Sequence, residues 1–236
     1  MKLKNTPLSA LTCAALLGSA ALSQGALIIG DIIGVTFGNS SVTTTMSGAA
    51  VIGASGDQWN NLRFGGSVSG LGTVGLNKTT GSSSGVSFAA TTGDGSGNNA
   101  NSGYDLYDGN MFLSPGNAGP STITISGLGA GVTIDLYLYA GAGHTSGEGA
   151  TFNFGSVKSA TDPNVAEGAY ADGSNYVLFS GLVADGSGTI SGTWSRNSGS
   201  DYSAFDGMQI GVTAIPEPSA ALLGGLGMLC LLRRRR

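Results

Sequence analysis

Thr122-Ile123-Thr124-Ile125-Ser126, followed by Val-Thr-Ile-Asp-Leu-Tyr-Leu-Tyr at residues 132–139, has the clearest strand pattern in the chain. In both segments an apolar side chain occupies every second position, which is the periodicity of a strand with one buried face. The glycine-containing residues 127–131 separate the two segments and are typical of a turn. We expect two adjacent strands that form an antiparallel pair.

Other short segments of strand character lie on both sides of this pair. Apolar and β-branched residues predict strands at residues 28–37, 42–52, 86–92, 151–154, 175–179, 188–194 and 205–212, with less regular candidates at 62–64 and 68–74. Residues 91–103 contain almost no apolar side chain and are expected to form a loop. The chain has 42 glycines without a three-residue repeat, which favours many tight turns. The sequence therefore predicts an all-β sandwich or barrel.

The C-terminal end of the chain differs in character from this middle region. Pro216 and Pro218 fix φ and hold Glu217 in an extended, exposed conformation. Residues 220–232 are apolar and uncharged, and a helix of that length spans about 20 Å, which is short for crossing a bilayer. The chain then ends in Arg233, Arg234, Arg235 and Arg236, which predict a cytoplasmic C-terminus.

The order of Pro-Glu-Pro, apolar segment and arginine cluster resembles the PEP-CTERM protein-sorting signal. The resemblance covers only the end of the chain. It implies that an exosortase-type membrane enzyme processes the protein, which contacts the membrane at least transiently and is then sorted to the cell surface or extracellular matrix. The alternative is an ordinary C-terminal anchor that is never cleaved.

The N-terminus carries a complementary signal. Lys2 and Lys4 precede an apolar stretch at residues 8–22, and small residues follow, which is the order of a secretory signal peptide. The cut is expected after Ser23 or after Ala26, and the sequence alone leaves both open. The expected division is a signal peptide at residues 1–26, a β-sandwich domain at 27–213 and a sorting signal at 214–236.

The exported part of such a chain is acidic and has no thiol. Cys13 and Cys230 both lie in the removable ends, so no disulfide is expected. Trimming leaves four cationic side chains and all fourteen acidic ones, a net charge of −10. This charge argues against nucleic acid or anionic lipid as a partner and is compatible with neutral polysaccharide or divalent cations.

The order of residues 176–179, 188–194 and 205–210 resembles the closing strands of jelly-roll domains in the galactose-binding-like class. The resemblance implies an antiparallel jelly-roll-like β-sandwich, flanked here by an N-terminal signal helix and a short C-terminal hydrophobic helix. Domains of this class commonly hold a structural Ca²⁺. Candidate oxygen ligands are Asp94, Asn98, Asp105 and Asp108. Their spacing is not that of an EF-hand or an RTX-type loop, so we expect no cofactor, with Ca²⁺ as the alternative.

Catalytic signatures are scarce in the sequence. The single histidine, His144, has Glu148 four residues later, and such a pair does not make a metal site by itself. Glycoside hydrolysis needs two carboxylates about 5–9 Å apart, and Asp105 and Asp108 are the best local pair for it. Two aspartates at this sequence spacing are also typical of a hydrated turn. The exported part lacks a nucleophile elbow, a His-Glu-x-x-His motif and any cysteine. We expect a protein that is not an enzyme.

Aromatic residues are the remaining candidates for ligand binding. Exposed aromatic rings on a β-sandwich can stack on sugar rings. Tyr137 and Tyr139 lie on the polar face of their expected strand. There they would either form an exposed platform for a sugar or pack under a neighbouring element. Trp194 shares parity with Ile190 and is expected in the core. The candidate carbohydrate contacts are Tyr104, Tyr107, Tyr137 and Tyr139. The leading hypothesis is an exported structural or adhesive protein; carbohydrate binding is the alternative, and a glycan-active enzyme the second alternative.

Overall fold

The computed structural model describes residues 25–64, 71–90, 95–98, 105–116, 119–141, 147–161, 169–197 and 202–217. The described residues form strands and no helix, so the prediction of an all-β protein is confirmed. The helices expected near residues 8–22 and 219–235 lie outside the described residues.

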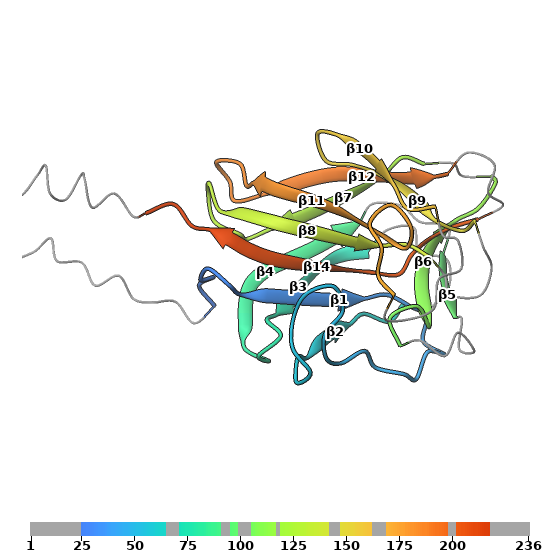
Figure 1. The fold of residues 1–236 in the computed structure, drawn as a ribbon, viewed down its shortest axis with the longest axis horizontal. Coiled ribbons are helices and arrows are strands. Elements are labelled where there is room, and N and C mark those ends of the chain that lie inside the picture. The colour runs from blue at the N-terminus through green and yellow to red at the C-terminus, as the bar shows by residue number, and fades with distance from the viewer. Residues whose placement is uncertain are drawn as a thin grey trace, which may run out of the picture.

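Two sheets pack face to face as the layers of a sandwich (Figure 1). The five-stranded sheet has the order β11 (Tyr176–Val183), β8 (Thr133–Tyr139), β14 (Gly207–Ala214), β1 (Ile32–Thr36) and β2 (Trp59–Asn61). The six-stranded sheet has the order β10 (Val157–Ser159), β9 (Ala150–Asn153), β12 (Ile190–Arg196), β7 (Ser121–Ser126), β4 (Ser83–Ala90) and β3 (Leu71–Asn77). Named strands pair antiparallel, apart from the parallel pair of β1 and β2.

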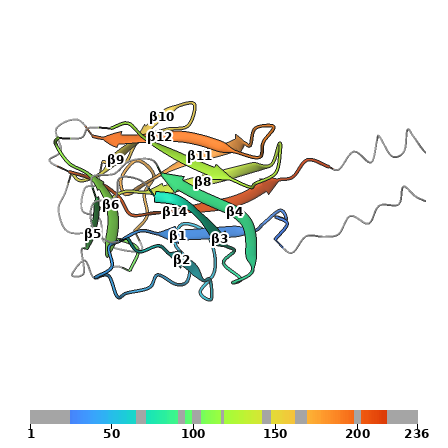
Figure 2. The same cartoon turned by 180° about the vertical axis from the view of Figure 1, so that it is seen from behind.

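A third sheet closes one end of the sandwich. It contains β13 (Ser203–Phe205), β6 (Gly109–Leu113) and β5 (Gly95–Asn98) in that order. Seen from behind, β5 and β6 lie at the end of the molecule opposite to the first and last described residues (Figure 2). The domain therefore has a closed end and an end from which both chain segments leave.

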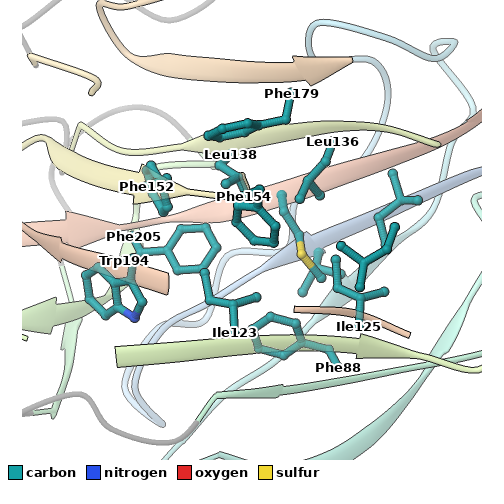
Figure 3. Packing of buried hydrophobic residues seen from close by; sticks show 14 of the residues in the cluster. Phe88, Ile123, Ile125, Leu136, Leu138, Phe152, Phe154, Phe179, Trp194 and Phe205 are labelled. Carbon is teal, nitrogen blue, oxygen red and sulfur yellow. The ribbon is translucent and has the colours of Figure 1, made fainter. Parts of the chain in front are cut away.

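The main core lies between the two large sheets (Figure 3). Leu136, Leu138 and Phe179 reach into it from the five-stranded sheet. From the six-stranded sheet come Phe88, Ile123, Ile125, Phe152 and Trp194. Phe205 of β13 packs against Phe152 and Trp194 with ring centroids 5.2 and 5.6 Å apart. The prediction that Trp194 points into the core is confirmed, since its side chain is fully buried.

The two alternating segments that dominate the sequence form β7 and β8, but they do not pair with each other. β7 pairs with β4 and β12, whereas β8 pairs with β11 and β14. Residues 127–132 cross from one sheet to the other, so the apolar faces of the two strands meet across the core. The expectation of an antiparallel pair was wrong because alternation shows which face is buried and not which strand lies beside it.

Two further segments differ from expectation. Residues 42–52 form no strand beyond an isolated bridge between Ser47 and Gln58. The N–H groups of Val51 and Ile52 donate to side chains of the sheet, and those of Gly48 and Ala50 donate to nearby backbone carbonyls. Part of the loop expected at residues 91–103 is β5, which pairs with β6 in the register Gly95 to Phe112. A strand of glycine, serine and asparagine has no apolar periodicity, so sequence reasoning missed it.

Candidate functional site

The outward face of the five-stranded sheet carries a cluster of tyrosines. Tyr137 and Tyr139 alternate with the core residues of β8, so both point away from the main core. On β11, Tyr176 lies opposite Tyr139 and Leu178 lies opposite Tyr137. Cross-strand neighbours on one face lie close enough to pack against each other. We call this cluster, together with Trp59, Tyr107 and Tyr170, the outer aromatic cluster.

The rings of the cluster are in mutual contact. Tyr176 lies 6.0 Å from Tyr139 and 6.2 Å from Tyr137, measured between ring centroids. Tyr139 also meets Tyr170 edge-on at 5.7 Å and lies 6.5 Å from Trp59. These separations fall in the range in which aromatic pairs attract one another. The cluster is therefore a second, smaller core on the outside of the sheet.

Glycines in β1 and β14 make room for the residues that cover this face. A Cβ on Gly34 would lie 2.6 Å from Cδ2 of Trp59, so the indole lies directly on the backbone of β1. A Cβ on Gly211 would lie 3.3 Å from Cδ1 of Ile52. Side chains at these outward positions would lift the covering residues off the sheet.

Residues 46–57 lie over the sheet and are held by side chains that rise from it. The Gln209 Nε2 donates to the Ile52 carbonyl at 2.9 Å, and the Ile52 N–H donates to Gln209 Oε1 at 3.3 Å. The Val51 N–H donates to the Tyr139 hydroxyl at 3.2 Å, and that hydroxyl donates to Gln209 Oε1 at 2.5 Å. Trp59 Nε1 donates to the Gly48 carbonyl at 2.8 Å. The backbone of this segment thus finds partners without joining a β-ladder.

Burial changes the acidity of the cluster. Loss of water contact raises the pKa of Tyr139 well above its ordinary value of 10.0, against the smaller lowering effect of the hydrogen bond from Val51. Burial also raises the pKa of Tyr137 and of Tyr176, with Asp135 and Asp172 as the nearby negative charges. All three phenols are therefore neutral hydrogen-bonding groups at physiological pH.

The structure brings together three of the four tyrosines proposed as carbohydrate contacts. Tyr107, Tyr137 and Tyr139 belong to the outer aromatic cluster, and Tyr104 lies outside the described residues. Tyr139 is 0% exposed and Tyr137 is 9% exposed, so neither ring forms an open platform. The half-buried members of the cluster are Tyr170, Tyr176 and Leu178.

Sequence reasoning did not select Tyr170 or Tyr176. Tyr176 could have been identified, because it lies in a segment expected to be a strand and faces the same side of that strand as Leu178. Knowing that this segment pairs with β8 would have placed Tyr176 beside Tyr139. Tyr170 lies outside any strand, and its contact with Tyr139 depends on tertiary structure alone.

The acidic candidates occupy different environments. Asp105 is exposed, whereas Asp108 is 4% exposed and interacts electrostatically with Arg63. Burial lowers the pKa of the Arg63 guanidinium, and the negative charge of Asp108 opposes this effect. A carboxylate that already has a cationic neighbour is a poorer ligand for Ca²⁺ than a free one. Asp94 and His144 lie outside the described residues, as does the side chain of Asn98.

No group of three or more histidine, cysteine, aspartate or glutamate side chains gathers in the part of the chain that the structure describes. Within the same residues there is no helix with the length and apolar character needed to span a bilayer.

The expected sorting motif begins on the folded domain. Ile215 packs against the main core, and a Cβ on Gly131 would lie 2.9 Å from Cγ of Pro216. Glu217 is exposed. Pro218 and the four arginines lie outside the described residues.

Comparisons with known proteins returned no relative. No protein-family model matches the chain, and no significant match was found among curated proteins or solved structures.

Proposed function

We propose that this protein is exported, processed at its C-terminal Pro-Glu-Pro signal by an exosortase-type enzyme, and displayed at the cell surface or in the extracellular matrix. Its role there is structural or adhesive and non-enzymatic. We further propose that its sandwich is of the jelly-roll type, preceded by a signal helix and followed by a short hydrophobic helix.

The observation that carries this proposal is that both ends of the domain leave from the same end of the sandwich (Figure 1). β1 and β14 are antiparallel neighbours, and Ile32, the first residue of β1, pairs with Gly211 near the end of β14. Residues 25–27 and 215–216 line one common groove of about 400 Å³. A domain of this form can approach a membrane with both of its ends at once.

The opposite end then faces outward. It is closed by the small sheet of β13, β6 and β5, which lies far from the chain ends in both views (Figures 1 and 2). With a net charge of −10 for the exported part, repulsion from anionic lipid headgroups also favours holding the domain body away from the bilayer. Display with the small sheet outward follows from these two properties.

The sorting proposal is tested by changing the signal in the full chain and locating the protein by cell fractionation. Replacing Glu217 by alanine within Pro-Glu-Pro, or the four terminal arginines by serine, is expected to trap the protein in the membrane fraction. Glu148→Ala is the control, since it removes a carboxylate from the domain. Normal surface delivery of both tail variants would overturn the proposal.

Carbohydrate binding is the second candidate, and the half-buried rim of the outer aromatic cluster favours it. Tyr170, Tyr176 and Leu178 come from a loop and a strand and leave part of their surface in solvent beside Tyr137. Rings that are held in place lose little entropy on binding a sugar face. The partner would be the polysaccharide that the cell itself secretes.

The test is a pull-down with that polysaccharide. Tyr176→Ala is expected to reduce retention at least several-fold, whereas Tyr202→Ala is the matched control. Tyr202 is a 47% exposed tyrosine that packs on Phe112, outside the cluster. Equal retention of the two variants, or no retention of the wild-type protein, would exclude this candidate.

A further inference from the structure

Residues 25–31 precede the first strand but belong to the folded domain. The Gly30 N–H donates to the Val212 carbonyl at 2.9 Å, and the Val212 N–H donates to the Asp31 carbonyl at the same distance. These bonds continue the pairing of β1 with β14 toward the N-terminus. The chain is therefore fixed before its first strand begins.

Lys78 ties this segment to the loop that follows β3. Its Nζ lies 2.7 Å from Asp31 Oδ2 and donates to the Ala26 carbonyl at 2.8 Å. Both charged side chains are 12% exposed, and the same Asp31 oxygen accepts the Ile28 N–H at 2.8 Å. A poorly solvated ammonium depends on such acceptors, so the Ala26 carbonyl is part of its environment.

Gly25 and Leu27 contact the domain as well. Gly25 has φ of 119°, and a Cβ on it would lie 3.4 Å from the backbone nitrogen of Gly85. Leu27 is partly buried against the main core. Together with Ala26, these residues line the same groove as Ile215 and Pro216.

The two expected export cuts have different consequences for these contacts. A cut after Ser23 keeps Gly25, Ala26 and Leu27 in the mature protein. A cut after Ala26 removes the carbonyl that accepts from Lys78 and creates a new α-ammonium on Leu27, in the same peptide unit. A second positive charge would then stand beside Lys78 where an acceptor stood before.

The residue types at the two cuts do not decide the site by themselves, but they agree with the cut that keeps these contacts. Signal peptide cleavage prefers small residues at the last and third-last positions of the removed segment. The cut after Ser23 offers Ser23 and Ala21, whereas the cut after Ala26 places the larger Gln24 at the third-last position.

We propose that export cleavage falls between Ser23 and Gln24. Residues 25–27 then remain in the mature domain, where the Ala26 carbonyl accepts a hydrogen bond from Lys78. The proposal rests on export itself, as proposed above. The new N-terminal Gln24 carries an α-amine that can attack its own side-chain amide, forming the ring carbon–nitrogen bond and releasing ammonia.

Mass spectrometry of the N-terminal tryptic peptide of the exported protein tests the proposal. Arg63 is the first basic residue after the cut, so the expected peptide is residues 24–63, either intact or lighter by one ammonia. A peptide of residues 27–63 would overturn the inference and leave export standing. A peptide of residues 5–63 in the exported protein would show that neither cut is made and would also overturn the inference. Export itself would be refuted if the protein were found only in the cytoplasmic fraction.

Two variants of the full chain sharpen the result. Ala26→Leu is expected to leave the start at Gln24, because the Ala26 side chain is exposed and only its carbonyl is used. Ser23→Leu is expected to abolish that start, because a bulky residue at the last position blocks cleavage. The reverse pattern would contradict the proposal.

Discussion

Gln209 holds the covering segment on the outer aromatic cluster. Its side chain is fully buried and satisfies both the N–H and the carbonyl of Ile52, as well as the Tyr139 hydroxyl. Gln209→Leu leaves the Ile52 N–H and the Tyr139 O–H without their acceptor, whereas the Ile52 carbonyl keeps the Ala50 N–H at 3.3 Å. Each buried polar group left without a partner costs about 1–3 kcal/mol. We expect a loss of about 3 kcal/mol in the free energy of unfolding, measured by urea denaturation.

The control for this substitution is Gln58→Leu, which makes the same chemical change at an exposed position. It is expected to change the free energy of unfolding by less than about 0.5 kcal/mol, as ordinary surface substitutions do. Equal effects of the two variants would show that Gln209 does not hold residues 46–57.

Tyr139 gives the fold a dependence on alkaline pH. Its pKa is raised well above 10.0 by burial, whereas an unfolded tyrosine ionises near pH 10. Above about pH 10 the unfolded chain releases a proton that the folded chain retains, so stability falls as pH rises; below that pH the contribution is fully present. The free energy of unfolding should fall more steeply above about pH 10 in the wild type than in Tyr139→Phe.

The comparison is made at matched pH values, because lysines titrate in the same range in both proteins. Parallel stability profiles for the wild type and Tyr139→Phe would contradict the burial of the phenol.

At the scale of single residues, sequence reasoning identified core positions better than site positions. Trp194 was placed in the core because it faces the same side of its strand as Ile190, and the structure buries it. Tyr137 and Tyr139 were correctly placed on the face opposite to the core residues of their strand. The sequence left open whether these rings form a platform or pack under a neighbouring element. The choice depends on residues 46–57, which are distant in sequence and have no matching periodicity.

At the scale of elements, Gly34 allows β1 to accept an indole on its outward face. Gly34→Ala would place a Cβ 2.6 Å from the Trp59 ring, and the indole would have to move. Overpacking of this kind costs about 1–3 kcal/mol. We expect a loss of stability in that range and a shift in tryptophan fluorescence as Trp59 becomes more exposed.

Gly75→Ala in β3 is the matched control for this prediction. It adds the same methyl group to a strand glycine, but nothing lies within 4 Å of the added Cβ. Stability should be retained or slightly increased, since alanine restricts the unfolded chain. If both variants unfold alike, the packing of Trp59 on β1 is not as described.

The pairing of β7 and β8 could not be predicted from the sequence pattern. β7 and β8 were recognised as strands, yet they belong to different sheets. A hairpin and a crossover between sheets present the same alternation and the same glycine-rich turn. Pairing is decided by which other strands compete for each edge, and here β4 and β12 occupy both edges of β7.

At the scale of the whole molecule, the turn before β8 contacts the start of the proposed sorting motif. Gly131 has φ of 74°, and a Cβ there would lie 2.9 Å from Pro216. Gly155 has a similar φ of 85° with nothing within 4 Å of an added Cβ. Both alanine variants share the backbone strain, so the additional loss of stability in Gly131→Ala measures the contact with Pro216.

We expect Gly131→Ala to speed amide hydrogen exchange at residues 212–217, and Gly155→Ala to leave exchange there unchanged. Equal exchange in the two variants would mean that the domain does not hold this segment.

We propose that the domain is delivered to the cell exterior by a C-terminal signal that is then removed. The most direct test of this proposal is the intact mass of the extracellular protein from cells with and without their exosortase. We predict a mass from exosortase-containing cells that lacks Arg233 to Arg236 and the apolar segment before them, and no such species without the enzyme. An extracellular chain that keeps Arg236 and has the same mass in both strains would contradict the account.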